Sequence, residues 1–386
     1  MHRMIAASLL LLLVLLTVPG CSNPATAGGS GVPSEPTVVQ TLSVFHRPES
    51  CVFSLDGDYL FVSNCASGIF GPEGFIGLVR GEGAVSKLKV TDDDRLEVID
   101  LKFVEGISTP LGITALPRAT AQFPAGTLFV VVGNALTVDG DGSMERRAEA
   151  LDTAALAIDP EDGTLRGRIR LDVGSAVAGH LGHPLLLPNG AAFDCEGNYY
   201  IADSGVGGDR LDPPQQANPG VVRIDHAALD ALAAEEPHQG VHFIPVPGGP
   251  NGVAYHEQED AIYVVTFGGD GPEGEAIYAI ARDAFAGGDL PEPLHAGVGT
   301  LDGLVVTPAG TLIASRMGGD LIAVPAGGEP QPIELAPEPL TFEGPSDIKL
   351  SQRADGRLML IVPEQEPAAA ESWSQRVHVV HLPPDY

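Results

Sequence analysis

Four residues far apart in the chain end in oxygen atoms that can bind a metal, and each opens the same kind of segment. They are Glu49, Asn189, Asn251 and Asp302. Each belongs to a short phrase, such as Pro188-Asn189-Gly190 or Pro250-Asn251-Gly252, that is followed by an apolar run. A set of carboxylate and amide oxygens without nitrogen or sulfur suits a hard cation, with Ca²⁺ the leading choice. If the four segments converge, these residues predict a site for one divalent ion.

The segments are hairpins that repeat along the chain. In the two clearest copies, which open at Asn189 and Asn251, an apolar run, a polar turn and a second apolar run follow one another. All six expected copies open at Glu49, Leu111, Asn189, Asn251, Asp302, and Ser346 or Asp347. A third apolar run is expected in each, at residues 75–79, 154–158, 221–224, 276–280, 321–324 and 377–381. Six units of at least three strands predict an all-β fold, a six-bladed β-propeller. Only residues 227–234 are expected to form more than one turn of helix.

A propeller would bring the openings of the six units together. The first strand of every blade lines a central channel, so the residues that open these strands meet at one end of it. A single Pro-Asn-Gly or Asp-Gly phrase is an ordinary turn sequence. Turns alone do not require an oxygen-bearing residue at the same place in four separate repeats, so the joint pattern favours a metal site.

These phrases resemble those of the family that contains senescence marker protein 30, gluconolactonase and luciferin-regenerating enzyme. The matching phrases are Pro48-Glu49-Ser50, Pro188-Asn189-Gly190, Pro250-Asn251-Gly252, Asp302-Gly303 and Pro345-Ser346-Asp347, within a resemblance that covers residues 40–386. It implies a six-bladed propeller that holds one divalent metal, usually calcium, through a Glu, two Asn and an Asp from different blades. Matched phrase by phrase, the resemblance places these ligands at Glu49, Asn189, Asn251 and Asp302, the four residues that the repeat itself indicates.

The resemblance also implies an activity, the hydrolysis of lactone esters. At such a site the metal would polarise the lactone carbonyl, while a carboxylate accepts a proton from the attacking water. Asp302 is the expected base. Direct ligation lowers the pKa of a carboxylate and weakens it as a base, so Asp347, which opens the sixth unit, is the reserve candidate.

One departure from the family pattern concerns the substrate. Sugar-lactone members carry an Arg two residues before the first metal Asn, where this chain has Leu187. An apolar wall at that point argues for a lactone or ester less polar than a sugar. His180 and His183 lie just upstream and are further candidates to line the substrate site. The sequence contains no Gly-x-Ser-x-Gly nucleophile elbow and no His-Glu-x-x-His zinc helix.

The N-terminus reads as an export signal. A short basic start, an apolar run too short to span a bilayer and the ending Val18-Pro19-Gly20-Cys21 resemble the lipobox of bacterial lipoproteins. We therefore expect a signal peptide over residues 1–20, lipidation of Cys21, a flexible tether over 21–37 and the propeller over 38–386. The expected location is the bacterial cell envelope, or the medium if Cys21 is not lipidated.

Three further cysteines allow at most one disulfide. They are Cys51, Cys65 and Cys195. Cys51 and Cys65 flank the first hairpin, but a turn centred on residues 56–57 places Cys51 opposite Val62. The hairpin register therefore does not join the two cysteines, and all three are expected to be buried small side chains.

The net charge excludes several classes of partner. With 51 acidic and 21 basic residues the formal charge is −30, which repels nucleic acid and anionic lipid surfaces and attracts cations. The protein would contact a membrane only through the lipid anchor at its N-terminus. Two alternatives to a hydrolase stay open. One is a non-catalytic exported propeller that binds a protein or small ligand and carries a structural calcium. The other is a condensing enzyme of the strictosidine synthase type, which would not require the four-oxygen set.

Overall fold

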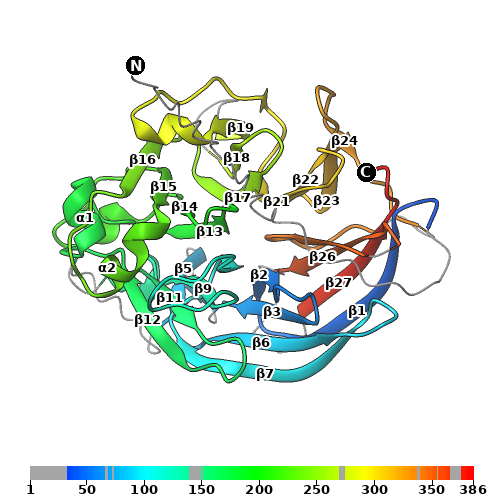
Figure 1. The fold of residues 1–386 in the computed structure, drawn as a ribbon, viewed down its shortest axis with the longest axis horizontal. Helices are drawn as coiled ribbons and strands as arrows, with labels where there is room; N and C mark the ends of the chain where they lie inside the picture. Colours follow the sequence, from blue (N-terminus) through cyan, green and yellow to red (C-terminus); the bar gives the residue numbers. More distant parts are fainter. Residues whose placement is uncertain are drawn as a thin grey trace, which may run out of the picture.

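The chain forms a ring of six antiparallel sheets around a central axis (Figure 1). The computed structural model describes residues 33–65, 68–71, 74–138, 148, 151–268, 274–336, 340–353, 355–365 and 375–386. Within these ranges each of the six sheets has four strands, and a seventh, three-stranded sheet stands apart from them. The predicted all-β, six-bladed β-propeller is confirmed.

The blades follow the chain in order, and each has its innermost strand at the channel and its fourth strand at the rim. Blade 1 contains β2 (Pro48–Phe53), β3 (Tyr59–Asn64), β6 (Gly83–Val90) and β7 (Leu96–Ile107), and blade 2 contains β8 (Ile113–Ala115), β9 (Leu128–Val132), β11 (Ala154–Ile158) and β12 (Leu165–Arg170). Blade 3 contains β13 (Pro188–Phe193), β14 (Tyr199–Asp203), β15 (Gly220–Ile224) and β16 (Val241–Pro245), and blade 4 contains β17 (Pro250–His256), β18 (Ala261–Thr266), β19 (Ala276–Ala281) and β20 (His295–Ala296). Blade 5 contains β21 (Leu301–Val306), β22 (Leu312–Arg316), β23 (Asp320–Val324) and β24 (Gln331–Pro332), and blade 6 contains β25 (Lys349–Gln352), β26 (Leu358–Glu364), β27 (Gln375–Leu382) and β1 (Thr37–Phe45).

Five of the six predicted third strands are confirmed, and the one in blade 1 is wrong. Residues 75–79 belong to β5 (Gly74–Val79), which pairs with β4 (Gly68–Gly71) and β10 (Thr137–Val138) in the three-stranded sheet. The third strand of blade 1 is β6, which pairs with β3 from Tyr59 opposite Lys89 to Asn64 opposite Ala84. The sequence therefore carries an inserted hairpin between the second and third strands of this blade.

The insertions lie at the end of the propeller where the inner strands begin. Because the strands of a blade alternate in direction, the connections from second to third strands lie at this same end. The three-stranded sheet is built from two such connections, since β5 leaves blade 1 and pairs in parallel with β10 of blade 2. Long connections gathered on one face of a repeat fold mark its binding face.

The N-terminal strand closes the ring. β1 pairs antiparallel with β27 over seven residue pairs and becomes the outer strand of blade 6 (Figure 1). Phe45, at the end of β1, is fully buried among residues of blades 1 and 6. The Thr41 hydroxyl lies 2.9 Å from Nδ1 of the His378 ring, whose Nε2 lies 2.9 Å from Glu364. Backbone pairing and a buried polar cluster thus join the N-terminal strand to the last blade, and Phe45 packs it against blade 1 as well.

Glu364→Gln is expected to lower the melting temperature at neutral pH. Burial raises the pKa of the Glu364 carboxyl, but the hydrogen bond to His378, the backbone N–H of Glu343 and the charges of His378 and Arg376 outweigh it and hold the pKa below its usual value. A carboxylate with a lowered folded pKa stabilises the protein above its unfolded pKa, and this contribution is lost as the pH falls through the folded pKa. Thermal unfolding across pH 3–7 should show the difference between wild type and variant shrinking at the acid end. An equal difference at every pH would contradict this role for the charge.

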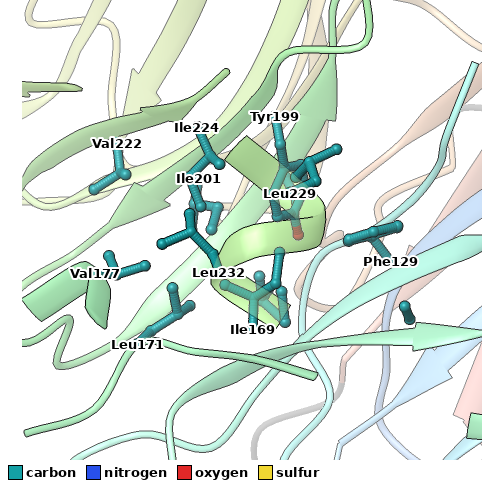
Figure 2. Packing of buried hydrophobic residues seen from close by; sticks show 14 of the residues in the cluster. Phe129, Ile169, Leu171, Val177, Tyr199, Ile201, Val222, Ile224, Leu229 and Leu232 are labelled. Carbon is teal, nitrogen blue, oxygen red and sulfur yellow. The ribbon is translucent and has the colours of Figure 1, made fainter. Parts of the chain in front are cut away.

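The largest apolar cluster lies between blades 2 and 3. Figure 2 shows Phe129 and Ile169 of blade 2 near Tyr199 of blade 3, with Leu229 and Leu232 of a short helix packed among them. The helix is α2 (Leu229–Ala233), preceded by a 3₁₀ turn over His226–Ala228, so the helix predicted at residues 227–234 is confirmed.

A second α-helix, α1 (Ala176–Leu181), was not predicted. Its N-cap is Ser175, whose side chain accepts a hydrogen bond from the Ala178 N–H, and its C-cap is Gly182 in the left-handed conformation. The six-residue helix lies between the outer strand of blade 2 and the inner strand of blade 3, before Asn189. Within the described ranges, no helix has the length and apolar character needed to cross a membrane.

The N-terminal predictions and the cysteine predictions have different outcomes. The signal peptide, Cys21 and all but the end of the tether lie outside the described residues. Strand β1 begins at Thr37, one residue before the expected start of the propeller. Cys51 pairs with Val62 in the hairpin register, as predicted, and Cys51, Cys65 and Cys195 are all free thiols. Cys51 and Cys65 are buried, whereas Cys195 is partly exposed.

Candidate functional site

The four predicted metal ligands lie at the openings of four inner strands, in blades 1, 3, 4 and 5. At each of them the strand pairing is irregular. The register shifts between Pro48 and Ser50, between Pro188 and Ala191, between Pro250 and Val253, and between Leu301 and Leu304. Such bulges release a residue from the ladder and redirect its side chain. The sequence repeat therefore corresponds to a repeated backbone feature at the channel end.

The glycine after three of the four predicted ligands, Asn189, Asn251 and Asp302, allows neighbouring inner strands to touch. A Cβ atom on Gly190 would lie 2.2 Å from the backbone oxygen of Asn251, and one on Gly252 would lie 2.5 Å from that of Asp302. The N–H of Gly112 donates to the Asn189 carbonyl at 2.8 Å, and the N–H of Asp347 donates to the Glu49 carbonyl at 2.9 Å. Neighbouring inner-strand openings are thus in contact around the channel end, and the predicted ligands belong to this ring of openings.

Gly190→Ala is expected to destabilise the protein by about 1–3 kcal/mol, because the added methyl group meets a backbone atom that cannot rotate away. The matched control is Gly179→Ala in helix α1, where a Cβ atom has open space and Ala favours the helix. Thermal unfolding of the two variants beside wild type should separate them clearly. A Gly190→Ala protein as stable as the control would show that the inner strands do not pack this closely.

Serine side chains at the ends of second strands fasten this ring. Ser63, Ser204 and Ser315 donate to the backbone carbonyls of Leu111, Pro250 and Ser346, each at the start of or just before the inner strand of the next blade, at 2.6–2.8 Å. Ser346 in turn donates to the Pro48 carbonyl at 3.0 Å. These serines are the small polar residues that end the repeated hairpins in the sequence. The sequence pattern therefore marked their positions, but it did not show which carbonyls they contact.

Three carboxyl groups are buried together in the ring. Glu49, Asp302 and Asp347 are 6%, 8% and 5% exposed. Burial and the charge of Asp347 raise the pKa of Glu49 to about 7, although Arg47 and a hydrogen bond from Gln365 act in the opposite direction. Burial, followed by the charges of Glu49 and Asp347, raises the pKa of Asp302 well above its usual range. Within the protein, therefore, the negative charge at this point is only partly compensated.

Several residues that the sequence reasoning missed hold these carboxylates. The Ser50 hydroxyl donates to Oδ2 of Asp347 at 2.5 Å, and the Lys349 ammonium lies 3.3 Å from the same oxygen. Gln365, at the end of β26, donates through its amide to Oε2 of Glu49. The contacts of Ser50 with Asp347 and of Gln365 with Glu49 join blades 1 and 6, whose residues are about 300 positions apart in the chain, so no local sequence pattern predicts them.

Asn189 is held by the loop before it. The buried carboxylate of Asp203, at the end of β14, accepts hydrogen bonds from the backbone N–H groups of Leu187 at 2.7 Å and Leu186 at 3.1 Å. Burial raises the pKa of Asp203 to about 6, while these backbone bonds act to lower it. The Leu187 side chain is half-buried against the large apolar cluster of blades 2 and 3. Asp203 thus fixes the approach to Asn189, a role that the hairpin pattern did not reveal.

The two predicted histidines lie on the outer side of this loop. His180 is exposed in helix α1. The His183 ring packs edge-on against Phe243 at a centroid distance of 5.0 Å, and Phe243 belongs to β16, the outer strand of blade 3. His183 also lies close enough to Asp203 for its charge to lower the pKa of that carboxyl. The structure therefore ties His183 to the loop that holds Asn189.

The residues present fit a divalent cation. Oδ1 of Asp302 and Oδ1 of Asp347 are both buried without a hydrogen-bond partner, a state that costs free energy unless another group satisfies them. Among the described residues, no three His, Cys, Asp or Glu side chains are grouped so as to hold a metal on their own. The predicted set differs because two of its four members are Asn189 and Asn251, and oxygen-only ligation of this kind is what Ca²⁺ accepts.

Comparison with known proteins identifies the fold. No family model matches the sequence, and no curated protein matches it either. Among solved structures the chain is similar to a gluconolactonase from Xanthomonas campestris, with 18% identity, coverage of 94% of this chain and 99% of that chain, and a TM-score of 0.52. It is also similar to a PQQ-bound aldose sugar dehydrogenase from Streptomyces coelicolor, with 14% identity, 91% and 99% coverage and a TM-score of 0.53.

A third similar structure is the major allergen Mala s 1 of Malassezia sympodialis, with 14% identity, 88% and 95% coverage and a TM-score of 0.54. The three proteins differ in what their names say they do. At these identities the likeness shows the propeller fold, and the function has to be argued from the site.

Proposed function

We propose that the chain is a hydrolase of a lactone or related ester that acts at the channel end with one divalent cation, most simply Ca²⁺. Glu49, Asn189, Asn251 and Asp302 would hold the ion. The observation that carries the proposal is the ring itself, in which four oxygen-bearing residues from four blades each stand at a register shift beside buried carboxyl groups. The fold shared with a gluconolactonase supports the reaction class.

Asp302 is the proposed general base. A bound divalent cation supplies electrophilic polarisation of the substrate carbonyl. The Asp302 carboxylate accepts the proton of the attacking water. Burial and the neighbouring carboxylates raise its pKa in the ion-free site, which opposes the lowering that ligation to the cation brings. Its Oδ1 has no hydrogen-bond partner within the protein and is therefore available to water or an ion.

Asp347 stays the reserve base. Ser50 and Lys349 both bind its Oδ2, which leaves Oδ1 unpartnered in the same buried region. An Asp347 held in this way presents one fixed oxygen to the channel end while the other is occupied. If Asp302 serves only as a ligand, this oxygen is the next candidate to accept the proton.

The proposed substrate is less polar than a sugar lactone. Leu187 precedes the first ligand Asn by two residues and packs against the apolar cluster, so it offers no hydrogen bond to a ring hydroxyl. We place Leu187 beside the site as its apolar wall, whereas His180 and His183 lie on the outer side of the loop and are not assigned a contact with the substrate. A γ- or δ-lactone with an alkyl chain suits such a wall better than a polyhydroxylated ring.

A hydrolysis assay tests the proposal. The protein is incubated with alkyl lactones, simple esters and gluconolactone, with Ca²⁺, with a chelator, and with Ca²⁺ restored. We expect turnover of an alkyl lactone or ester that is lost on chelation and regained with the ion. If chelation lowers the melting temperature while none of these compounds is consumed under any condition, the hydrolase proposal fails and the non-catalytic propeller with a structural ion takes its place.

A further inference from the structure

Arg47 stands at the channel end in a conformation that its residue type disfavours. It lies between β1 and β2, two residues before Glu49, and its φ of 52° is in the left-handed region where a side chain adds strain. Its carbonyl accepts the N–H of Cys65 at 2.9 Å, which fixes the backbone there. Strained residues of this kind gather at functional sites, where the surroundings compensate their cost.

The guanidinium of Arg47 forms no ion pair and no hydrogen bond with an acidic side chain in the described ranges, although its charge acts on nearby Glu49. The side chain is half-buried, and its Nε is buried without a hydrogen-bond partner. None of the ion pairs among the described residues includes it, although the chain has 51 acidic side chains to 21 basic ones. Arg316, which ends β22 at the same end of the propeller, shows the usual arrangement, since it is paired with Asp320. An unsatisfied buried N–H beside a site points to a ligand that satisfies it.

The charges around Arg47 determine whether that ligand is an anion or a cation. When all three are ionised, as around a bound cation, Glu49, Asp302 and Asp347 bring three negative charges, while Arg47 and Lys349 bring two positive ones. Lys349 is already bound to Asp347. A divalent cation in the site would reverse the balance to a net positive charge and leave Arg47 as the unengaged cation. A guanidinium pairs best with a carboxylate or phosphate, and a lactonase forms a carboxylate whenever it opens a ring.

We propose that Arg47 anchors a carboxylate group of the ligand at the channel end. This inference rests on the proposed function and narrows its substrate to esters or lactones whose reaction places a carboxylate beside Arg47. The carboxylate has two possible sources, a free acid group on the substrate and the acid formed by hydrolysis. With the apolar Leu187 two residues before Asn189, the ligand is a compact acid with a hydrocarbon body.

Equilibrium binding tests the anchor without relying on turnover. Ca²⁺-saturated protein is titrated by calorimetry with glutaramate, which has one carboxylate, and with its neutral analogue glutaramide. We expect wild type to bind glutaramate roughly ten- to a hundredfold more tightly than glutaramide, because an ionic hydrogen bond contributes that much. Arg47→Gln should lose this preference. The matched control Arg316→Gln removes the same charge from the same end and should keep it.

Two further variants distinguish loss of the carboxylate anchor from misfolding of the protein. Arg47→Gly removes the guanidinium and also relieves the left-handed backbone, so its melting temperature should equal or exceed that of wild type while the preference for glutaramate is lost. Arg47→Lys should retain part of the preference through its charge. If Arg47→Gln binds glutaramate as tightly as wild type does, or if wild type shows no preference for the acid, the anchor is overturned.

Kinetics with monomethyl and dimethyl glutarate separate the two sources of the carboxylate. If the substrate's own acid group is bound, Arg47→Gln lowers kcat/KM for the monomethyl ester alone. If the newly formed acid is bound, the variant leaves that ratio unchanged and weakens product inhibition for both esters. Should neither ester be consumed while the calorimetric preference persists, the hydrolase proposal fails and the carboxylate anchor stands.

Discussion

Asp302→Asn and Glu49→Gln are each expected to abolish turnover and to weaken Ca²⁺ binding at least about a hundredfold. Each substitution keeps the size and shape of the side chain but removes one of the two carboxylates assigned to the ion, and hard cations depend on charged oxygen ligands. Asp302→Asn also removes the proposed base, so its kcat should stay negligible even at Ca²⁺ concentrations that fill the weakened site. Calorimetry and initial rates at saturating Ca²⁺ are the measurements.

Stability separates this explanation from simple misfolding. Burial and the neighbouring charges of Glu49 and Asp347 raise the pKa of Asp302, which means that the ion-free protein holds repelling carboxylates together. In chelator, Asp302→Asn should therefore melt at the same or a higher temperature than wild type, while the gain in melting temperature on adding Ca²⁺ is lost. The control is Asp162→Asn, which removes an exposed charge from the turn between β11 and β12 at the opposite end. Full activity of Asp302→Asn or of Glu49→Gln would contradict the assigned mechanism.

Deleting residues 37–45 is expected to abolish the cooperative folding of the whole propeller. The deletion removes β1, exposes the edge of β27 along seven residue pairs and empties the site of Phe45, which is fully buried. Loss of a buried Phe side chain alone costs about 3–5 kcal/mol, against a typical total stability of about 5–15 kcal/mol. Thermal unfolding should show a transition lowered by tens of degrees or none at all.

The control for this deletion is a chain that starts at residue 33 and keeps β1 intact. It should unfold like the full chain, since strand pairing begins at Thr37. Adding the segment 33–47 as a separate peptide should restore part of the transition, because β1 contributes through backbone pairing that does not require a covalent link. A deleted protein as stable as its control would show that the ring needs no closing strand.

The sequence predicted the blades because each hairpin is a local feature. An apolar run, a turn and a second apolar run are neighbours in the chain, and their register can be counted from the turn, as the pairing of Cys51 with Val62 confirms. Residues 75–79 and β6 are both apolar runs that follow the first hairpin. Only pairing in space shows that β6 is the third strand of blade 1 and that β5 joins the three-stranded sheet. The closing role of β1 has the same origin, since its partner β27 is more than 300 residues away.

The candidate site likewise has some residues that the sequence predicted and others that only the structure shows. Glu49, Asn189, Asn251 and Asp302 stood out because the repeat places them at one position of each unit. Their supports did not, because Gln365, Lys349 and Asp203 reach the ring from other strands or other blades. Arg47 escaped notice because a basic residue beside a turn carries no signal until its neighbours and its φ are known. Sequence repeats thus indicated the candidate ligands, whereas the contacts that hold them required the structure.

Calorimetric titration of the chelator-stripped protein with Ca²⁺ tests whether four blades share one metal site, and Asn189→Ala and Asn251→Ala are titrated beside it. We expect one saturable site in wild type that both substitutions weaken, because each removes an amide oxygen from a different blade. Gly179→Ala, remote from the ring in helix α1, should bind as wild type does. A wild-type protein that takes up no ion, or variants that bind it unchanged, would contradict the four-blade site.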